Sequence, residues 1–362
     1  MNRSGFRSAV LSLGIALATV VVALLISMLI IELTNGESVA ALRALWDGAF
    51  GNKNQVAGTL SKMIPLILVA LGWIVAFAAR RINIGLEGQI LIGGTLATVV
   101  GLKLGLPTVF HLPIAVLGGI VGGAAWAGIA AWLWARRSVN EIISTLMLNF
   151  VAIQLVSWLV RGPIQEASHT FPRSATIPDS ALWPRIIPHT SLGFDFFLTL
   201  GVVTLVSVML RRTAFGFRLR LTGSNETAAR YAGVKTVQVT VLALLLSGGL
   251  AGLAGASLIL GGETASMSDN FSAGFGFTGI VVALLARNSP FGTIPAALLF
   301  SALRQGGGLM EARVGVSSAI VLITSAVVIL LVAASGYLTE RRRSVRVEAS
   351  TGAGDPVPVG EA

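Results

Sequence analysis

The chain has 362 residues, of which 54% are hydrophobic and only 12% charged, and its mean hydropathy is +0.83. Such a composition is typical of helical proteins that cross a membrane several times, and it excludes an ordinary soluble domain. The net charge of +10 belongs to basic residues that flank apolar runs, which favours a topological role over nucleic-acid binding. The chain has no Cys and its three His are scattered, which excludes disulfides and metal sites built from Cys or His.

Apolar runs of membrane-spanning length recur along the chain and predict an all-α polytopic membrane protein with about ten transmembrane segments. The first run has no small-residue cleavage site, so it is interpreted as a retained span and not as a signal peptide. Residues 261–287 are too polar and Gly-rich for a full span and predict a short, broken element that lines a cavity. The other predicted spans are 10–31, 60–79, 82–101, 112–135, 142–160, 192–210, 236–260, 290–303 and 316–337.

The basic residues at the ends of these runs orient the protein, because cytoplasmic loops carry an excess of Lys and Arg. They predict that both termini are cytoplasmic and that the loop with the most basic residues faces the cytoplasm. In the span over 236–260, Gly248, Gly252 and Ala256 recur every four residues, a spacing that predicts close helix packing. The predicted regions are a cytoplasmic N-terminus (1–9), a transmembrane domain (10–338) with external loops (32–59 and 161–191) and a basic cytoplasmic loop (211–235), and a disordered cytoplasmic tail (339–362).

Five polar residues lie inside apolar sequence and are candidates for a substrate pathway. Burying an ionisable group at membrane depth costs about 2.5 to 3.5 kcal/mol, so an acid in a span should face a cavity or a partner. Glu87 and Asn83 are four residues apart on one helical face, although a position near the inner interface would leave the acid merely solvated. For Asn149 and Gln154 an interhelical hydrogen bond is favoured over substrate contact. The candidates are Asn83, Glu87, Gln89, Asn149 and Gln154.

The basic loop contains the segment NETAARY (225–231), whose composition predicts a brief amphipathic helix. Thr222, Ser224 or Asn225 can cap its start, and Gly233 can end it. A helix of two turns is not stable alone in water, so it is expected to dock onto another surface. A plain solvated loop is the alternative interpretation.

No known catalytic motif is present in the sequence. The chain has no phosphate-binding loop of the form GxxxxGK[ST], no HExxH and no GxSxG. The protein is therefore expected to move a solute and not to act as an enzyme. An ion-coupled secondary transporter of a small polar solute remains an alternative, although only Glu87 is an acid well inside a span.

Five motifs carry a family resemblance, and they follow one another between about residues 83 and 303. They resemble the permease subunits of bacterial ABC importers for simple sugars and nucleosides, the branched-chain amino acid/ribose-like permeases, and most of all the longer permease of nucleoside-type systems. The motifs are NIGLEGQILIGG, NEIISTLMLNFVA, LRLTGSNETAARYAGV, LSGGLAGLAGA and FGFTGIVVALLARNSPFGTIPAALLFSAL.

The resemblance implies a multi-pass protein of the bacterial inner membrane that imports nucleosides or simple sugars by alternating access. It implies three partners: an ABC ATPase that binds ATP and Mg, a second, shorter permease, and an extracytoplasmic solute-binding lipoprotein. Membrane lipid is a further expected partner, nucleic acid is not expected as one, and no cofactor is expected in this chain itself. The residues that match the family's ATPase-coupling motif are Gly223, Asn225, Glu226, Ala228, Ala229 and Gly233.

Overall fold

The structure is a computed structural model that describes residues 37–262 and 265–317, with isolated residues between 22 and 33 and between 320 and 327. The chain divides into two compact units, of which one comprises residues 43–315. The other comprises residues 1–42 and 316–362, and within it the backbone amide of Ser38 donates to Glu32. All of the sites discussed below lie in the unit formed by residues 43–315.

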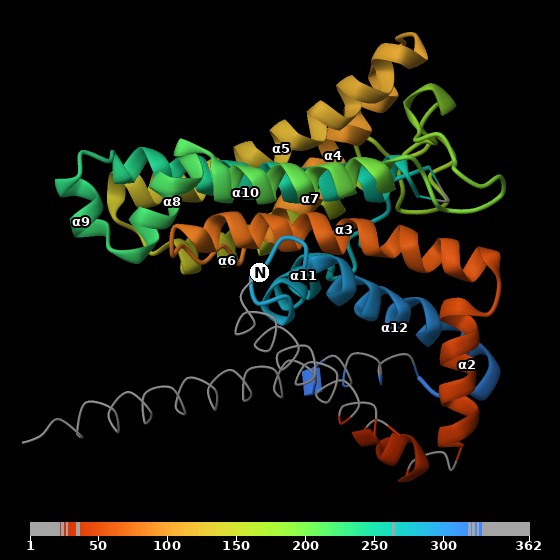
Figure 1. Cartoon of the computed structure of the whole chain (residues 1–362). Helices are drawn as coiled ribbons and strands as arrows, with labels where there is room; N and C mark the ends of the chain where they lie inside the picture. Colours follow the sequence, from red (N-terminus) through yellow and green to blue (C-terminus); the bar gives the residue numbers. More distant parts are fainter. Residues whose placement is uncertain are drawn as a thin grey trace, which may run out of the picture. The chain divides into compact units, whose positions relative to one another are not determined.

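The described part of the chain is built from α-helices, as the composition predicts (Figure 1). The helices are α2 (Ser38–Phe50), α3 (Lys53–Ala78), α4 (Leu86–Lys103), α5 (Thr108–Arg137), α6 (Glu141–Val160), α7 (Asp195–Arg212), α8 (Ala214–Ser224), α9 (Glu226–Tyr231), α10 (Thr236–Leu260), α11 (Phe275–Leu285) and α12 (Thr293–Val314). A 3₁₀ turn covers Asp179–Ala181.

Among the described residues, four helices are long and apolar enough to cross a membrane: α3, α5, α6 and α10. The pair α7 and α8 makes a possible fifth span, bent by 68° at Thr213. The predicted spans between 60 and 303 each coincide with an observed helix. The predicted first span and most of the predicted last one lie outside the described residues. The total of about ten spans stays a prediction.

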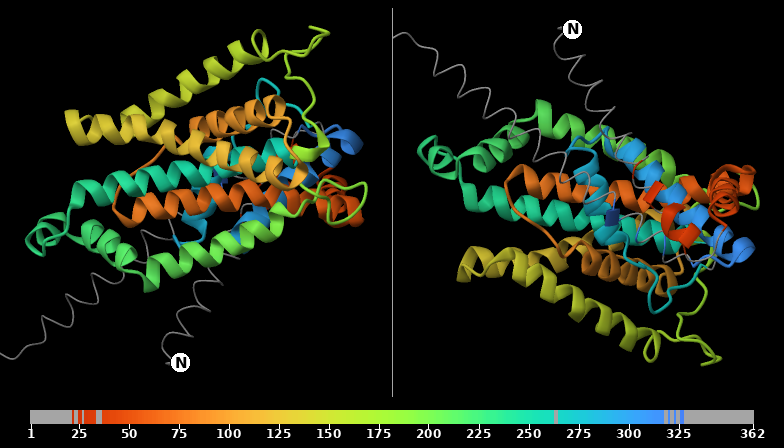
Figure 2. Two further views of the ribbon diagram at one scale, coloured as in Figure 1. Left: turned by 90° about the horizontal axis from the view of Figure 1, so that it is seen from above. Right: turned by 90° about the horizontal axis from the view of Figure 1, so that it is seen from below.

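Helix α3 is the central helix of the unit formed by residues 43–315. It is apolar all round, and helices α10, α11, α12 and α7 pack against it, which is why almost every residue from Met63 to Ala76 is buried. Figure 2 shows it enclosed by the neighbouring helices in two further views. Because it is surrounded, polar positions on it face either another helix or an internal cavity.

Close helix packing joins α10 to α5 and uses glycines on both helices. A Cβ placed on Gly252 would overlap the carbonyl of Gly119, and one on Gly248 would overlap the carbonyl of Gly123. The small-residue spacing in the sequence predicted this contact on the α10 side. The two helices therefore approach as nearly as their backbones allow.

The segment predicted as an external loop, 32–59, contains α2 and the first turns of α3, and its external position stays a prediction. Helix α3 starts at Lys53, seven residues before the predicted span begins. Asn52 caps it, with its side-chain oxygen accepting from the amides of Asn54 and Gln55 at 2.9 and 3.0 Å. The polar residues around Asn52 resemble the sequence of a loop, but they begin a helix.

The predicted loop over 161–191 is largely irregular, as its five prolines indicate, and it is fixed to the end of α10. Arg185 donates to the carbonyls of Gly261 (2.6 Å) and Gly262 (2.9 Å), which lie just after the C-terminus of α10. A cation at the C-terminal end of a helix is favourable. This loop lies at the end of the bundle opposite α8 and α9 (Figure 1).

Candidate functional site

Three of the predicted pathway residues form an interhelical hydrogen-bond framework at the start of α4. The side chains of Asn83 and Gln89 are fully buried and form a reciprocal amide pair, with N···O distances of 2.9 and 3.0 Å. Asn83 also donates to Ser247 of α10 at 2.9 Å.

Asn149 of α6 holds the same segment from the other side. It accepts from the backbone amide of Gly88 at 2.8 Å and donates to the backbone carbonyl of Ile84, just before α4, at 2.9 Å. These amides hold α4 between α6 and α10.

Glu87 also lies in a protein environment, where its carboxylate caps a helix. It accepts from the backbone amides of Gly274 (3.0 Å) and Gly276 (2.6 Å) at the N-terminus of α11, and it is 5% exposed. A negative charge at a helix N-terminus is stabilising, and backbone donors satisfy the buried carboxylate. Arg304 of α12 holds the same segment, because it donates to the carbonyl of Ala273 at 2.6 Å.

The broken element predicted over 261–287 is thus observed as the short helix α11 preceded by irregular backbone. The Arg304 guanidinium lies 4.0 Å from the ring centroid of Phe275, the first residue of α11. Gln154, the remaining predicted pathway residue, is exposed on α6 and is not among the residues that line the cavity described next.

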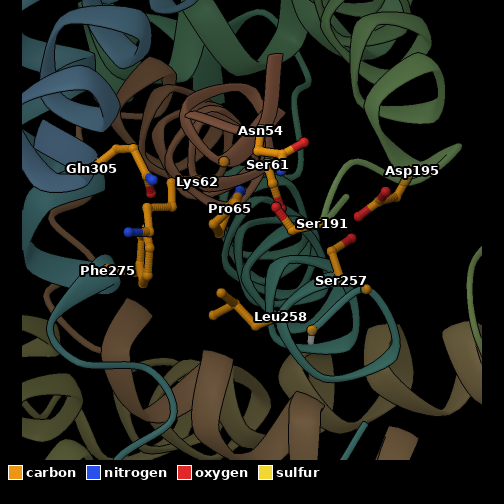
Figure 3. Close-up of a pocket in the computed structure, with 13 residues that line it drawn as sticks. Asn54, Ser61, Lys62, Pro65, Ser191, Asp195, Ser257, Leu258, Phe275 and Gln305 are labelled. Atoms are coloured by element: carbon orange, nitrogen blue, oxygen red, sulfur yellow. The ribbon is translucent and has the colours of Figure 1, made fainter. Parts of the chain in front are cut away.

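A polar cavity of about 460 Å³ opens at the end of the bundle that carries the 161–191 loop. Figure 3 shows Asp195 and Ser257 on one side of it and Lys62 and Gln305 on the other. Asp195 and Ser257 are 3% and 4% exposed, and no hydrogen bond of ordinary length reaches Asp195 Oδ1 or Ser257 Oγ within the described residues. Buried polar atoms nearly always have partners, so this wall is suited to a polar ligand.

None of the five residues predicted for the pathway lines this cavity. The sequence offered one signal for Asp195, an acid directly at the start of an apolar run, and such an acid is usually read as a span boundary. The other polar lining side chains come from α3, the 161–191 loop, α10 and α12 and were not recognised: Asn54, Ser61, Lys62, Ser191, Ser257 and Gln305.

At the opposite end of the bundle, α8 and α9 form a helical arm. Helix α8 was not predicted; Thr213 caps it by accepting from the amide of Gly216 at 3.1 Å. Asn225, one of the three predicted caps, starts α9 by accepting from the amide of Ala228 at 2.9 Å. Gly233 follows with a φ of +78°, the left-handed conformation expected of a glycine that ends a helix.

The residues that match the coupling motif divide into inward- and outward-facing sets. Gly223 packs so closely on the carbonyl of Ala78 that a Cβ would overlap it, and Ala229 is fully buried. Ala228 is exposed, and Tyr231, which was not among the predicted coupling residues, is 90% exposed. The outward surface of α9 therefore includes Ala228 and Tyr231, together with Thr227 and Arg230, while Gly223 and Ala229 fix the arm to the bundle.

Arg81 connects this arm to the membrane helices. Its guanidinium forms ion pairs with Glu226 of α9 at 3.0 Å and with Glu141 of α6 at 3.6 Å, and it lies 4.3 Å from the ring centroid of Trp134 on α5. Glu226 also pairs with Arg230 at 2.6 Å. Only 17% of the Arg81 side chain is exposed. One side chain after the end of α3 thus links α9 to two membrane helices.

The sequence of this chain matches those of known proteins. A family model described as "Branched-chain amino acid transport system / permease component" matches residues 55–337. The chain is 36% identical over 342 residues to the glucose ABC transporter permease protein TsgB13 of Haloferax volcanii, covering 92% of this chain and 90% of TsgB13. It is 35% identical over 311 residues to the guanosine ABC transporter permease protein NupP of Bacillus subtilis, covering 84% and 89%. NupQ, a second guanosine permease of that bacterium, is 25% identical over 256 residues, covering 68% and 79%.

Proposed function

Because this chain belongs to the permease family of branched-chain amino acid transport systems, we propose that it is the longer of two permease subunits in an ATP-driven nucleoside importer. The family indicates an ABC importer of the inner membrane that works with an ATPase subunit and a binding protein. The pairing with a shorter permease is supported by Bacillus subtilis, where NupP and NupQ both match and NupP matches more of this chain. Simple sugars are the second candidate cargo, since TsgB13 is a glucose permease.

The chemistry of the cavity supports a cargo rich in hydroxyl groups. Its volume of about 460 Å³ lies within the range of small-molecule sites. The Asp195 carboxylate and the Ser257 hydroxyl can accept hydrogen bonds from a ribose, while Gln305 on the facing wall offers an amide. We infer that this cavity receives the solute from the binding protein on the outer side.

The arm formed by α8 and α9 supports docking of the ATPase. A helix of six residues is too short to be stable alone, and here it is braced by Asn225, Ala229 and Arg81 while Ala228 and Tyr231 face outward. Under this proposal ATP and Mg are bound by the partner ATPase, and this chain contributes no catalytic residue. Movement of α9 is passed through Arg81 to α6 and α5.

The proposed docking of the ATPase on α9 also sets the orientation of the chain in the membrane. The end of the bundle with α9 faces the cytoplasm, the 161–191 loop faces outward, and about ten spans leave both termini inside. The alternative, an ion-coupled carrier, needs a titrating acid at membrane depth. Glu87 is a poor candidate, because two backbone amides already occupy its carboxylate.

Docking is tested by changing the outward surface of α9. The double variant Ala228→Trp/Tyr231→Ala is expected to lower co-purification of the ATPase about tenfold, since exposed aromatic side chains dominate interface energies. Phe171→Ala is the matched control, because Phe171 is also an exposed aromatic residue but lies in the 161–191 loop at the other end. Equal recovery of the ATPase with the wild type, the double variant and Phe171→Ala would refute docking on α9.

A further inference from the structure

A second cavity, of about 540 Å³, lies at the end of the bundle that carries α8 and α9. It is formed where α3 and α7 end, beside α8 and the turn between α11 and α12. Each of these four elements contributes one arginine to its lining: Arg80, Arg211, Arg220 and Arg287. This second cavity and the solute cavity share no lining residue.

The charge of these four arginines is not neutralised within the described residues. No acidic residue lines the cavity, and none of the four guanidinium groups takes part in a hydrogen bond or an ion pair there. The neighbouring Arg81 shows the contrast, because it has two carboxylate partners. Four arginines that line one cavity without a counter-charge make a site for an anion, and guanidinium groups suit phosphate oxygens in particular.

The backbone also departs from its ordinary conformation to form this lining. Arg80 and Arg287 have φ values of 53° and 52°, and the next residue, Asn288, has 55°. Left-handed backbone at residues other than glycine is energetically costly and is found preferentially at functional sites. Both strained positions place an arginine at the cavity.

The remaining walls of the cavity are apolar. Ile74 and Phe77 of α3, Leu210 of α7 and Pro290 line it, and Phe77 is 37% exposed. A small inorganic anion would gain nothing from these walls. A molecule with a phosphate head and a hydrocarbon chain would contact both the arginines and the apolar surface.

We propose that this cavity binds the phosphate headgroup of an anionic phospholipid from the cytoplasmic leaflet. The proposal rests on the orientation given under Proposed function, which places α9 inside. Basic pockets between membrane helices on the cytoplasmic side are suited to such headgroups. A bound lipid would join the ends of α3 and α7 to α8 and the α11–α12 turn, beside the coupling arm.

The test is native mass spectrometry of the full-length chain in detergent, with phosphatidylglycerol or phosphatidylcholine added. We expect the wild type to bind phosphatidylglycerol at least about tenfold more tightly than phosphatidylcholine, and Arg211→Gln/Arg287→Gln to lose this preference. Arg136→Gln/Arg137→Gln removes the same amount of charge from the end of α5, outside the cavity. This variant is expected to keep the preference for phosphatidylglycerol. Equal loss in both double variants, or no loss in either, would overturn the proposal.

A competition arm identifies the source of the phosphate. Millimolar inorganic phosphate is expected to leave phosphatidylglycerol bound, because it cannot use the apolar walls; displacement of the lipid would assign the cavity to a free anion instead. The measurement contains no ATPase and no solute. A negative result therefore overturns the lipid site alone, whereas failure of the importer proposal would appear as loss of ATPase docking.

Discussion

Replacing Arg81 with Gln is expected to leave the importer assembled and able to hydrolyse ATP, while ATP-driven uptake falls at least about tenfold. The substitution removes the ion pairs to Glu226 and Glu141 and the contact with the Trp134 ring, so α9 loses its connection to α6 and α5. It also leaves the partly buried carboxylate of Glu141 without its partner, which is costly, while Glu226 keeps its ion pair with Arg230. Uptake and ATP hydrolysis measured in the same proteoliposomes separate loss of coupling from loss of assembly.

Two further variants serve as controls, one outside this junction and one within it. Arg136→Gln, an exposed cation at the same end of the bundle, is expected to transport normally. The charge exchange Arg81→Glu/Glu226→Arg is expected to recover part of the uptake, because it rebuilds one of the ion pairs. Normal uptake by Arg81→Gln would mean that force reaches the membrane helices by another route.

Replacing Asp195 with Asn is expected to raise the KM of guanosine uptake about tenfold, because a buried polar group that loses its hydrogen-bond partner costs about 1 to 3 kcal/mol. The change keeps the shape of the side chain and replaces one of its two oxygens with an NH2 donor. Asp179→Asn is the matched control, since Asp179 is an exposed acid at the same end that does not line the cavity.

Discrimination between cargoes distinguishes solute contact from a structural role of Asp195. The wild type is expected to prefer guanosine to 2′,3′-dideoxyguanosine, and Asp195→Asn to reduce that preference, because an NH2 donor replaces one of the two oxygens that can accept from the ribose hydroxyls. Unchanged discrimination with a lowered maximal rate would show that Asp195 only positions the start of α7.

Much of the helical framework was predictable from the sequence, because apolar runs and the glycine spacing on α10 are local signals. α8 was missed because its arginines resemble a loop. The site was less predictable for a physical reason. Asn83 and Glu87 are conspicuous polar residues in apolar sequence, but their partners, Ser247 and the amide of Gly276, lie far away in the chain.

The coupling arm shows the same limit. A motif identifies which residues are small, but only the packing against Ala78 shows that Gly223 faces inward. Tyr231 carries the exposed aromatic surface of α9 and was not singled out, because exposure is a property of the tertiary structure. The assignment of the five polar residues between Asn83 and Gln154 to a substrate pathway stays a prediction.

The central claim is that this chain moves its solute only when a separate ATPase acts on it. It is tested most directly by guanosine uptake into proteoliposomes that contain either this chain alone or the complete importer with both permeases, the ATPase and the binding protein. We predict uptake by the complete importer with ATP inside, and none by the chain alone under a proton or sodium gradient. Accumulation of guanosine by the chain alone would contradict the account.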